Sequence, residues 1–420
     1  MIALALRAFA RTWPALLAWF LAGWTVRLLL LRLAGWAAEN IDPLVGQLIL
    51  PLAVLARLAS YIGMFLVLRP VLAHFERLEQ FADRTVPGAP RGFFATWAAT
   101  LNTSILPFFL IYAAWGLIAD DAYAYSAASL DQMVLDFDAP VGPVETPLDT
   151  PLSFATVAIV VVAFTLRRLI ARFATKLPAW IGAITVYLEA VWIITALSFI
   201  GQLLAGVPDW LASRRMFAWA VNGWEQWRES LDWVRAIGDG IAWIAQQLGD
   251  VVAQPLAWLT LAAIVLAGAL PLARRTRSRR RTRLDAARVS ATRRWRRIGP
   301  RTRRILMLPL NGIVERWQPI GTALRLIWRA GPLAMGFYVL AFGVLTVASA
   351  WLGWAAYHAV GPHELSWFAA LDQPISLVID TIVFPLQLCL VAAAFDRCLR
   401  ALDETVTTPA AELAEIHPTP

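Results

Sequence analysis

Charged residues inside long apolar stretches are the first candidates for chemistry in this sequence. An ionised side chain near the middle of a bilayer is costly unless it is paired or hydrated, so such residues commonly serve a function. The candidates are Arg27, Arg57, Glu189 and Asp380. We expect Arg27 or Arg57 to pair with Glu189, and Asp380 to take the other arginine. Such pairs can fix the register of packed helices or line a path for protons or ions, and both interpretations stay open.

Two adjacent acids, Asp120 and Asp121, follow the third long apolar stretch. An enzyme that modifies lipids or lipid-linked glycans on the external face would place carboxyl groups there for acid–base work. Paired acids at such a position more often mark the boundary with water. The sequence leaves both explanations in place.

Motifs that would identify an enzyme or a metal site are missing from the sequence. The sole lysine, Lys176, follows Ala174-Thr175, so a phosphate-binding loop that ends in Gly-Lys is excluded. Gly-x-Ser-x-Gly, His-Glu-x-x-His and Cys-x-x-Cys do not occur. His358 and His363 are spaced as in no common zinc site. We therefore assign no catalytic residue, no metal ligand and no cofactor.

The densest charge in the chain lies between residues 274 and 304, which contain many arginines and one acid, Asp285. Anionic lipid headgroups attract such a segment by about 1 kcal/mol per basic residue near the surface, so we expect contact with anionic lipid or an acidic partner. A signal that only sets topology would look the same. Nucleic acid is not expected, because Trp295 is the only aromatic residue among these arginines. The contact candidates are Arg274, Arg275, Arg279, Arg280, Arg281, Arg293, Arg294, Arg296 and Arg297.

The amino-acid composition indicates that the chain resides in a lipid bilayer and not in water. Of 420 residues, 59% are hydrophobic and 16% are charged. That is too little polar surface to cover a water-soluble globule of this size. The 21 tryptophans agree, because the indole ring favours the headgroup level of a bilayer. The sequence therefore predicts an integral membrane protein.

Eight apolar stretches are predicted to cross the membrane as helices. A hydrocarbon core of roughly 30 Å requires about 20 residues, and seven stretches meet or nearly meet that length. The eighth, 151–166, is short, and Arg167 and Arg168 follow it. The predicted spans are 13–36, 44–68, 93–118, 151–166, 178–206, 254–273, 331–357 and 374–396.

The distribution of basic residues predicts the orientation. Cytoplasmic segments collect Arg and Lys, and most of the 37 basic residues fall in 1–12, 69–92, 167–177, 274–330 and 397–420. Segment 119–150 holds acids and no basic residue. We therefore expect both termini in the cytoplasm, the spans arranged as four in–out–in hairpins, and residues 397–420 as a cytoplasmic tail. The dominance of Arg over Lys suggests a bacterial plasma membrane.

Residues 207–253 are predicted to be external. Apolar residues recur there at helical spacing with charges between them, which is typical of an amphipathic helix. Its tryptophans favour a position along the outer leaflet, and its length would also allow it to project from the membrane. A second amphipathic helix is expected near the membrane surface at the end of segment 274–330.

The first and last hairpins resemble each other. Arg11, Pro14 and residues 35–38 match Arg329, Pro332 and residues 353–356 without a gap. In addition, each returning span is predicted to begin at a proline, namely Pro43, Pro151, Pro255 and Pro374. An internal repeat and a coincidence of topology both explain these matches, because proline suits the first turn of a helix.

Together these features predict an all-α, polytopic transmembrane helix bundle of about eight spans, with an external amphipathic helix. The domain plan is membrane hairpins over 1–206, the amphipathic helix over 207–253, a sixth span over 254–273, the Arg-rich segment over 274–330, the last hairpin over 331–396 and the tail over 397–420. We expect a non-enzymatic scaffold or accessory subunit of a cell-envelope or transport complex, in contact with the bilayer and with a membrane or envelope protein. A small-solute or ion transporter is the first alternative, and an external lipid- or glycan-modifying enzyme is the second.

Overall fold

The fold is that of a computed structural model of the whole chain. It describes residues 1–76, 92–114, 120–128, 154–173, 181–205, 207–214, 239–240, 243, 248–269 and 331–416. Within these residues nearly every position is helical and none is in a strand, as the apolar, all-α sequence pattern predicts. The Arg-rich segment 274–330 and most of 207–253 lie outside the described residues.

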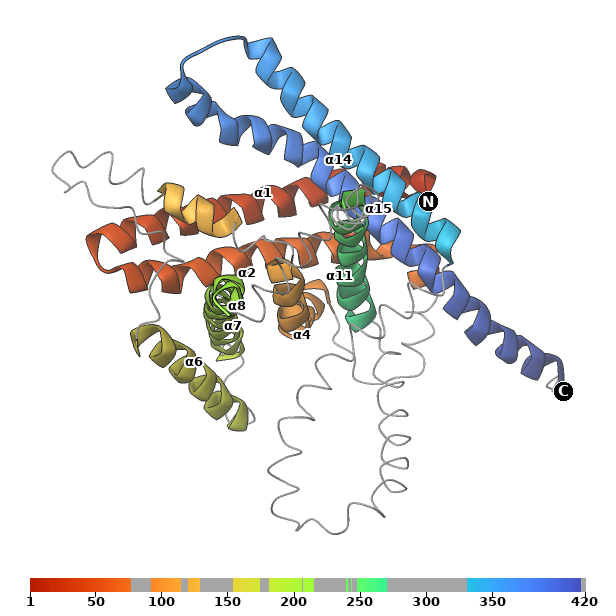
Figure 1. Ribbon diagram of the computed structural model, residues 1–420. Coiled ribbons are helices and arrows are strands. Elements are labelled where there is room, and N and C mark those ends of the chain that lie inside the picture. The colour runs from red at the N-terminus through yellow and green to blue at the C-terminus, as the bar shows by residue number, and fades with distance from the viewer. Residues whose placement is uncertain are drawn as a thin grey trace. The chain divides into compact units, whose positions relative to one another are not determined.

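A helix overlaps each of the eight predicted apolar stretches, and the first and last helices extend well beyond theirs (Figure 1). The longer ones are α1 (Ile2–Asn40), α2 (Pro43–Leu68), α4 (Phe93–Ala114), α6 (Phe154–Arg172), α7 (Ile181–Ala205), α11 (Gln254–Ala269), α14 (Pro332–Val360) and α15 (Leu365–Ile416). Shorter elements are η1 (Arg69–Val71), α8 (Val207–Ala212) and the π-helical η2 (Leu248–Ala253). Residues 73–76 and 120–128 are also helical.

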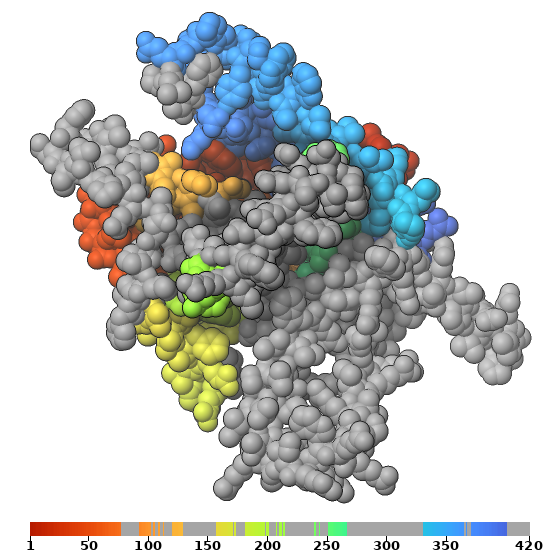
Figure 2. Space-filling model, viewed as in Figure 1, coloured from red at the N-terminus to blue at the C-terminus, as the bar shows by residue number. Residues whose placement is uncertain are grey.

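Among the described residues, four helical segments are long and apolar enough to cross a membrane: Ile2–Asn40, Pro43–Val71, Pro332–Val360 and Leu371–Arg400. Ile181–Leu197 and Val251–Leu266 are apolar but shorter. The chain is therefore described as a helical membrane protein with four helices of membrane length. On α14, large apolar side chains such as Leu333, Leu340 and Val344 are exposed, and much of this helix is visible in blue in Figure 2. Lipid is the natural cover for such a face.

One of the prolines predicted to begin a returning span, Pro374, takes a different position. Pro43 begins α2 and Pro255 is the second residue of α11, as expected for a proline in the first turn. Pro374, in contrast, lies inside α15, which begins at Leu365. Pro14 lies inside α1, whereas its match Pro332 begins α14. The prediction that every returning helix starts at its proline is therefore wrong for the last helix.

The chain divides into two compact units, and α1, α2 and α4 each contribute residues to both. Unit 1 contains Met1–Gly23, Leu58–Phe108 and Pro255–Pro420. Unit 2 contains Trp24–Arg57 and Phe109–Gln254.

Aromatic rings form the centre of unit 1. Tyr61, Trp258 and Phe384 contact one another with ring centroids 4.9 to 5.5 Å apart. Trp19 packs against Trp97, and its ring leaves no room for a side chain at Gly63. In the same unit α14 packs against α15, the pair of blue helices in Figure 1.

Unit 1 also contains a polar contact between residues far apart in the sequence. Asp396 of α15 is buried, and its Oδ1 accepts hydrogen bonds from the backbone N–H groups of His74 and Phe75, at 3.0 and 3.1 Å. Its Oδ2 lies 2.9 Å from His74 Nδ1. Asp396 therefore caps the start of helix 73–76 with a side chain from the last helix of the chain.

In unit 2 small residues let three helical segments approach closely. Leu31 and Ala34 of α1, Leu50 and Ala53 of α2, and Tyr125 of helix 120–128 form one buried cluster. A Cβ atom on Gly46 would overlap the Tyr125 hydroxyl and would lie 2.7 Å from the Ala34 carbonyl oxygen. Elsewhere in this unit α6 packs against α7, and Tyr187 of α7 donates a hydrogen bond to the Leu48 carbonyl.

Candidate functional site: a buried ionic network

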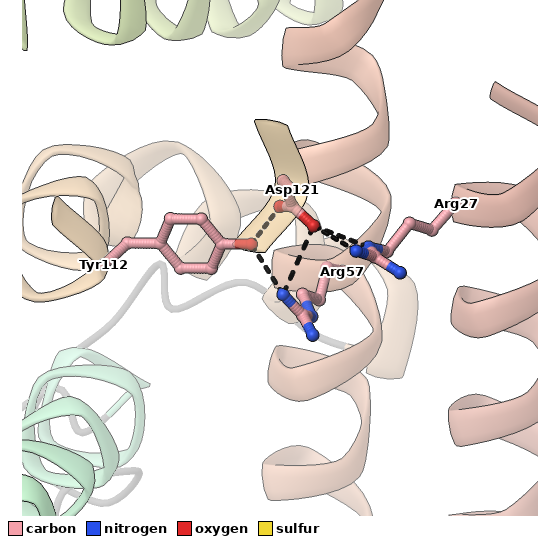
Figure 3. A network of polar contacts seen from close by, with 4 residues as sticks. All are labelled: Arg27, Arg57, Tyr112 and Asp121. Atoms are coloured by element: carbon pink, nitrogen blue, oxygen red, sulfur yellow. Dashed lines mark hydrogen bonds and ion pairs between the residues drawn. The ribbon is translucent and has the colours of Figure 1, made fainter. Parts of the chain in front are cut away.

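A network of four polar side chains lies in unit 2 (Figure 3). Arg27 comes from α1, Arg57 from α2, Tyr112 from α4 and Asp121 from helix 120–128. Figure 3 shows the Asp121 carboxylate with Arg27 on one side and with Arg57 and Tyr112 on the other. Four segments thus each bring one side chain to the same place.

Both carboxylate oxygens of Asp121 accept hydrogen bonds. Oδ1 accepts from Nε of Arg27 at 2.8 Å and also from its Nη2, and it lies 3.4 Å from Nη1 of Arg57. Oδ2 accepts from the Tyr112 hydroxyl. The same hydroxyl accepts a hydrogen bond of 2.7 Å from Nη1 of Arg57. The arrangement is cyclic, so each group fixes the position of the next.

The network is buried at its centre and less enclosed at its edge. The Asp121 side chain is 1% exposed, and Tyr112 is fully buried. The side chains of Arg27 and Arg57 are 15% and 24% exposed. A carboxylate this well buried would be costly without positive partners, and the two guanidinium groups provide them.

Asp121 is the residue that sequence reasoning missed. The sequence places it at a water boundary or in an external active site, and the structure instead makes it the buried partner of two arginines. Its neighbour Asp120 is exposed. One signal in the sequence could have identified Asp121. Arg27 and Arg57 lie inside two consecutive spans and require a nearby acid, and Asp121 follows the third span, 93–118.

Glu189 is bound to a different arginine from the one that we predicted. Its Oε1 lies 2.9 Å from Nη2 of Arg167, which comes from the neighbouring helix α6. The Glu189 side chain is 7% exposed and that of Arg167 is 19% exposed. Because α6 and α7 are adjacent in the chain and packed together, this pair forms locally. Glu189 thus has an arginine partner that the sequence did not predict, and its pairing with Arg27 or Arg57 stays a prediction.

The remaining predicted residues are Asp380 and the nine lipid-contact arginines. Asp380 is an exposed residue of α15 in unit 1, flanked at two residues on either side by the exposed Val378 and Ile382. Asp121 contacts both arginines, and the pairing of Asp380 with Arg27 or Arg57 stays a prediction. The nine lipid-contact arginines, from Arg274 to Arg297, lie outside the described residues.

Comparison of the chain with models of known protein families, with curated proteins and with solved structures finds no match. Functional inference therefore depends on the sequence and on this geometry.

Proposed function

We propose that the chain is a non-enzymatic multi-pass membrane protein that serves as a scaffold or accessory subunit of a cell-envelope or transport complex. The supporting observation is how the charged residues of the apolar helices are used. Arg27 and Arg57 share Asp121, and Glu189 binds Arg167. In both contacts the acid is buried and held by arginine.

Such contacts suit a structural role better than a transport pathway. A residue that moves an ion must exchange its partner for water or for the ion during each cycle. Asp121 is enclosed, and both its oxygens accept hydrogen bonds from protein groups, so its contacts favour one arrangement of α1, α2, α4 and helix 120–128. Buried ionic groups are best attested in the role of fixing register and orientation.

The proposal includes the finer topology. Eight spans in four in–out–in hairpins would place both termini in the cytoplasm of a bacterial cell. The Arg-rich segment 274–304 would then bind anionic lipid on the inner leaflet, and residues 207–253 would contact the envelope side. The supporting observations are the arginine distribution along the chain and the four helices of membrane length.

Crosslinking mass spectrometry on native membranes tests the scaffold role. We expect a tagged copy expressed at its native level to give reproducible crosslinks to one or a few membrane or envelope proteins. The matched control is the same tag on an unrelated polytopic protein of the same membrane. If the two samples yield the same partners, the scaffold proposal fails.

Transport is the second candidate, because the Arg57 side chain is 24% exposed and so is partly accessible at the edge of the network. Glu189→Gln separates the two functions. If Glu189 is structural, the change lowers thermal stability, and replacing both Glu189 and Arg167 by Met restores part of it, since the second change removes the arginine left unpaired. If Glu189 conducts, Glu189→Gln leaves a stable protein that has lost solute flux in proteoliposomes.

A further inference from the structure

Helix 120–128 lies at a depth that the hydrophobic core of the membrane must include. A core of roughly 30 Å takes about 20 helical residues, and every run of that length inside α2 contains Arg57. Asp121 Oδ1 lies 3.4 Å from Nη1 of Arg57, so Asp121 is within one arginine side chain of that depth. Helix 120–128 therefore starts below the surface of the membrane.

From Asp121 the helix runs toward the turn between α1 and α2, at Ile41 and Asp42. Tyr125, one turn after Asp121, packs in the cluster with Ala34 and Leu50, and its hydroxyl lies beside Gly46. Ala34 and Gly46 are both nearer to this turn than Arg27 and Arg57 are. The direction of the helix is thus from the ionic network back toward the membrane surface.

The opposite face of this helix is exposed and carries a charge. Asp120, Tyr123 and Ala127 are exposed at the spacing of one helix face, whereas Asp121, Ala122 and Tyr125 are buried. Asp120 is bonded directly to Asp121, so the two Cα atoms are about 3.8 Å apart and lie at nearly the same depth. An ionised carboxylate facing lipid at that depth is strongly disfavoured, and water is the medium that accommodates it.

We propose that residues 120–128 form a helix that begins within the membrane and runs out toward the α1–α2 turn, and that water entering from that side wets its face with Asp120 and Tyr123. The buried face closes the ionic network, and the wet face is accessible to small hydrophilic solutes. This property is separate from the scaffold role, because it concerns where water penetrates the protein and not what the protein assembles with.

Cysteine labelling in lipid nanodiscs tests this inference, since both faces of the membrane are accessible there. Tyr123→Cys reports on the proposed wet face, because Tyr123 is 73% exposed. Leu29→Cys is the matched control, because Leu29 is 62% exposed on α1, two residues from Arg27. The native Cys389 and Cys398 are buried, so the parent protein serves as the blank. The probe is a charged maleimide, which reacts with thiolate in water.

We expect Tyr123→Cys to react at least tenfold faster than Leu29→Cys, with both variants monodisperse and as stable as the parent. Ala127→Cys repeats the measurement on the same face if Tyr123→Cys does not fold. If Leu29→Cys also reacts fast, the part of α1 beside Arg27 lies outside the bilayer, and the proposal is overturned. Slow reaction of Tyr123→Cys and Ala127→Cys would mean that lipid or protein covers this face, which also overturns it.

Discussion

At the scale of single residues, the important feature is one buried carboxylate shared by two arginines. Arg27 and Arg57 are predictable from the sequence, because ionisable residues inside apolar spans require partners. Their partner is not predictable, because Asp121 follows a span and has an acidic neighbour in Asp120, a context that suggests solvent. Only the structure separates the two acids into one that is buried and one that is exposed.

Asp121→Asn is expected to destabilise the protein by about 3–5 kcal/mol, because it removes the buried carboxylate that two partly buried guanidinium groups share. The measurement is the midpoint of thermal unfolding in detergent, followed by a conformation-sensitive dye or by loss of monodisperse protein. Asp120→Asn is the matched control, and its exposed site predicts a change within about 0.5 kcal/mol. Equal effects of the two substitutions would show that the network does not stabilise the fold.

At the scale of elements, glycine and alanine determine how closely the helices of unit 2 pack. The apolar pattern predicts α2 within a residue at each end, because its composition favours a long helix in a bilayer, whereas α1 begins eleven residues before its predicted span 13–36. It does not predict that helix 120–128 packs against both, since that contact depends on the space available at Ala34 and Gly46. The same holds for Asp396, which caps helix 73–76 from the other end of the chain.

Gly46→Ala is expected to destabilise the protein by about 1–3 kcal/mol, since its new Cβ would overlap the Tyr125 hydroxyl and the Ala34 carbonyl. Thermal unfolding measures the effect, and Tyr125→Phe in the same chain should relieve part of it. Gly336→Ala on α14 is the control, because a Cβ there meets open space. That change should be neutral or slightly stabilising, since alanine favours helix more than glycine does. A harmless Gly46→Ala would disprove the close approach of these segments.

At the scale of the whole molecule, the sequence predicts the environment and the orientation of the chain. Four helices of membrane length agree with a membrane protein, and eight spans remain a prediction. The orientation depends on the basic residues of five segments and on the acids of 119–150. Residues 274–304 and 129–150 lie outside the described residues, so an experiment on intact cells tests the orientation.

Thiol labelling of single cysteines in intact cells tests the predicted topology. We expect a cysteine between residues 129 and 150 to react with an impermeant reagent added outside. A cysteine between residues 274 and 304 should react only after the membrane is permeabilised. Reaction of both positions from the same side would refute the predicted arrangement of spans.

The sequence by itself determined that this protein resides in a membrane, that it is helical, and which charged residues lie within its apolar stretches. Hydrophobicity and charge are local properties of the chain, so a sequence pattern records them. The tertiary structure decided which charges meet. Arg27 and Arg57 bind Asp121, and Glu189 binds Arg167, because pairing depends on the faces that packed helices present to one another. Those faces are set by contacts between residues far apart in the sequence, which no local pattern records.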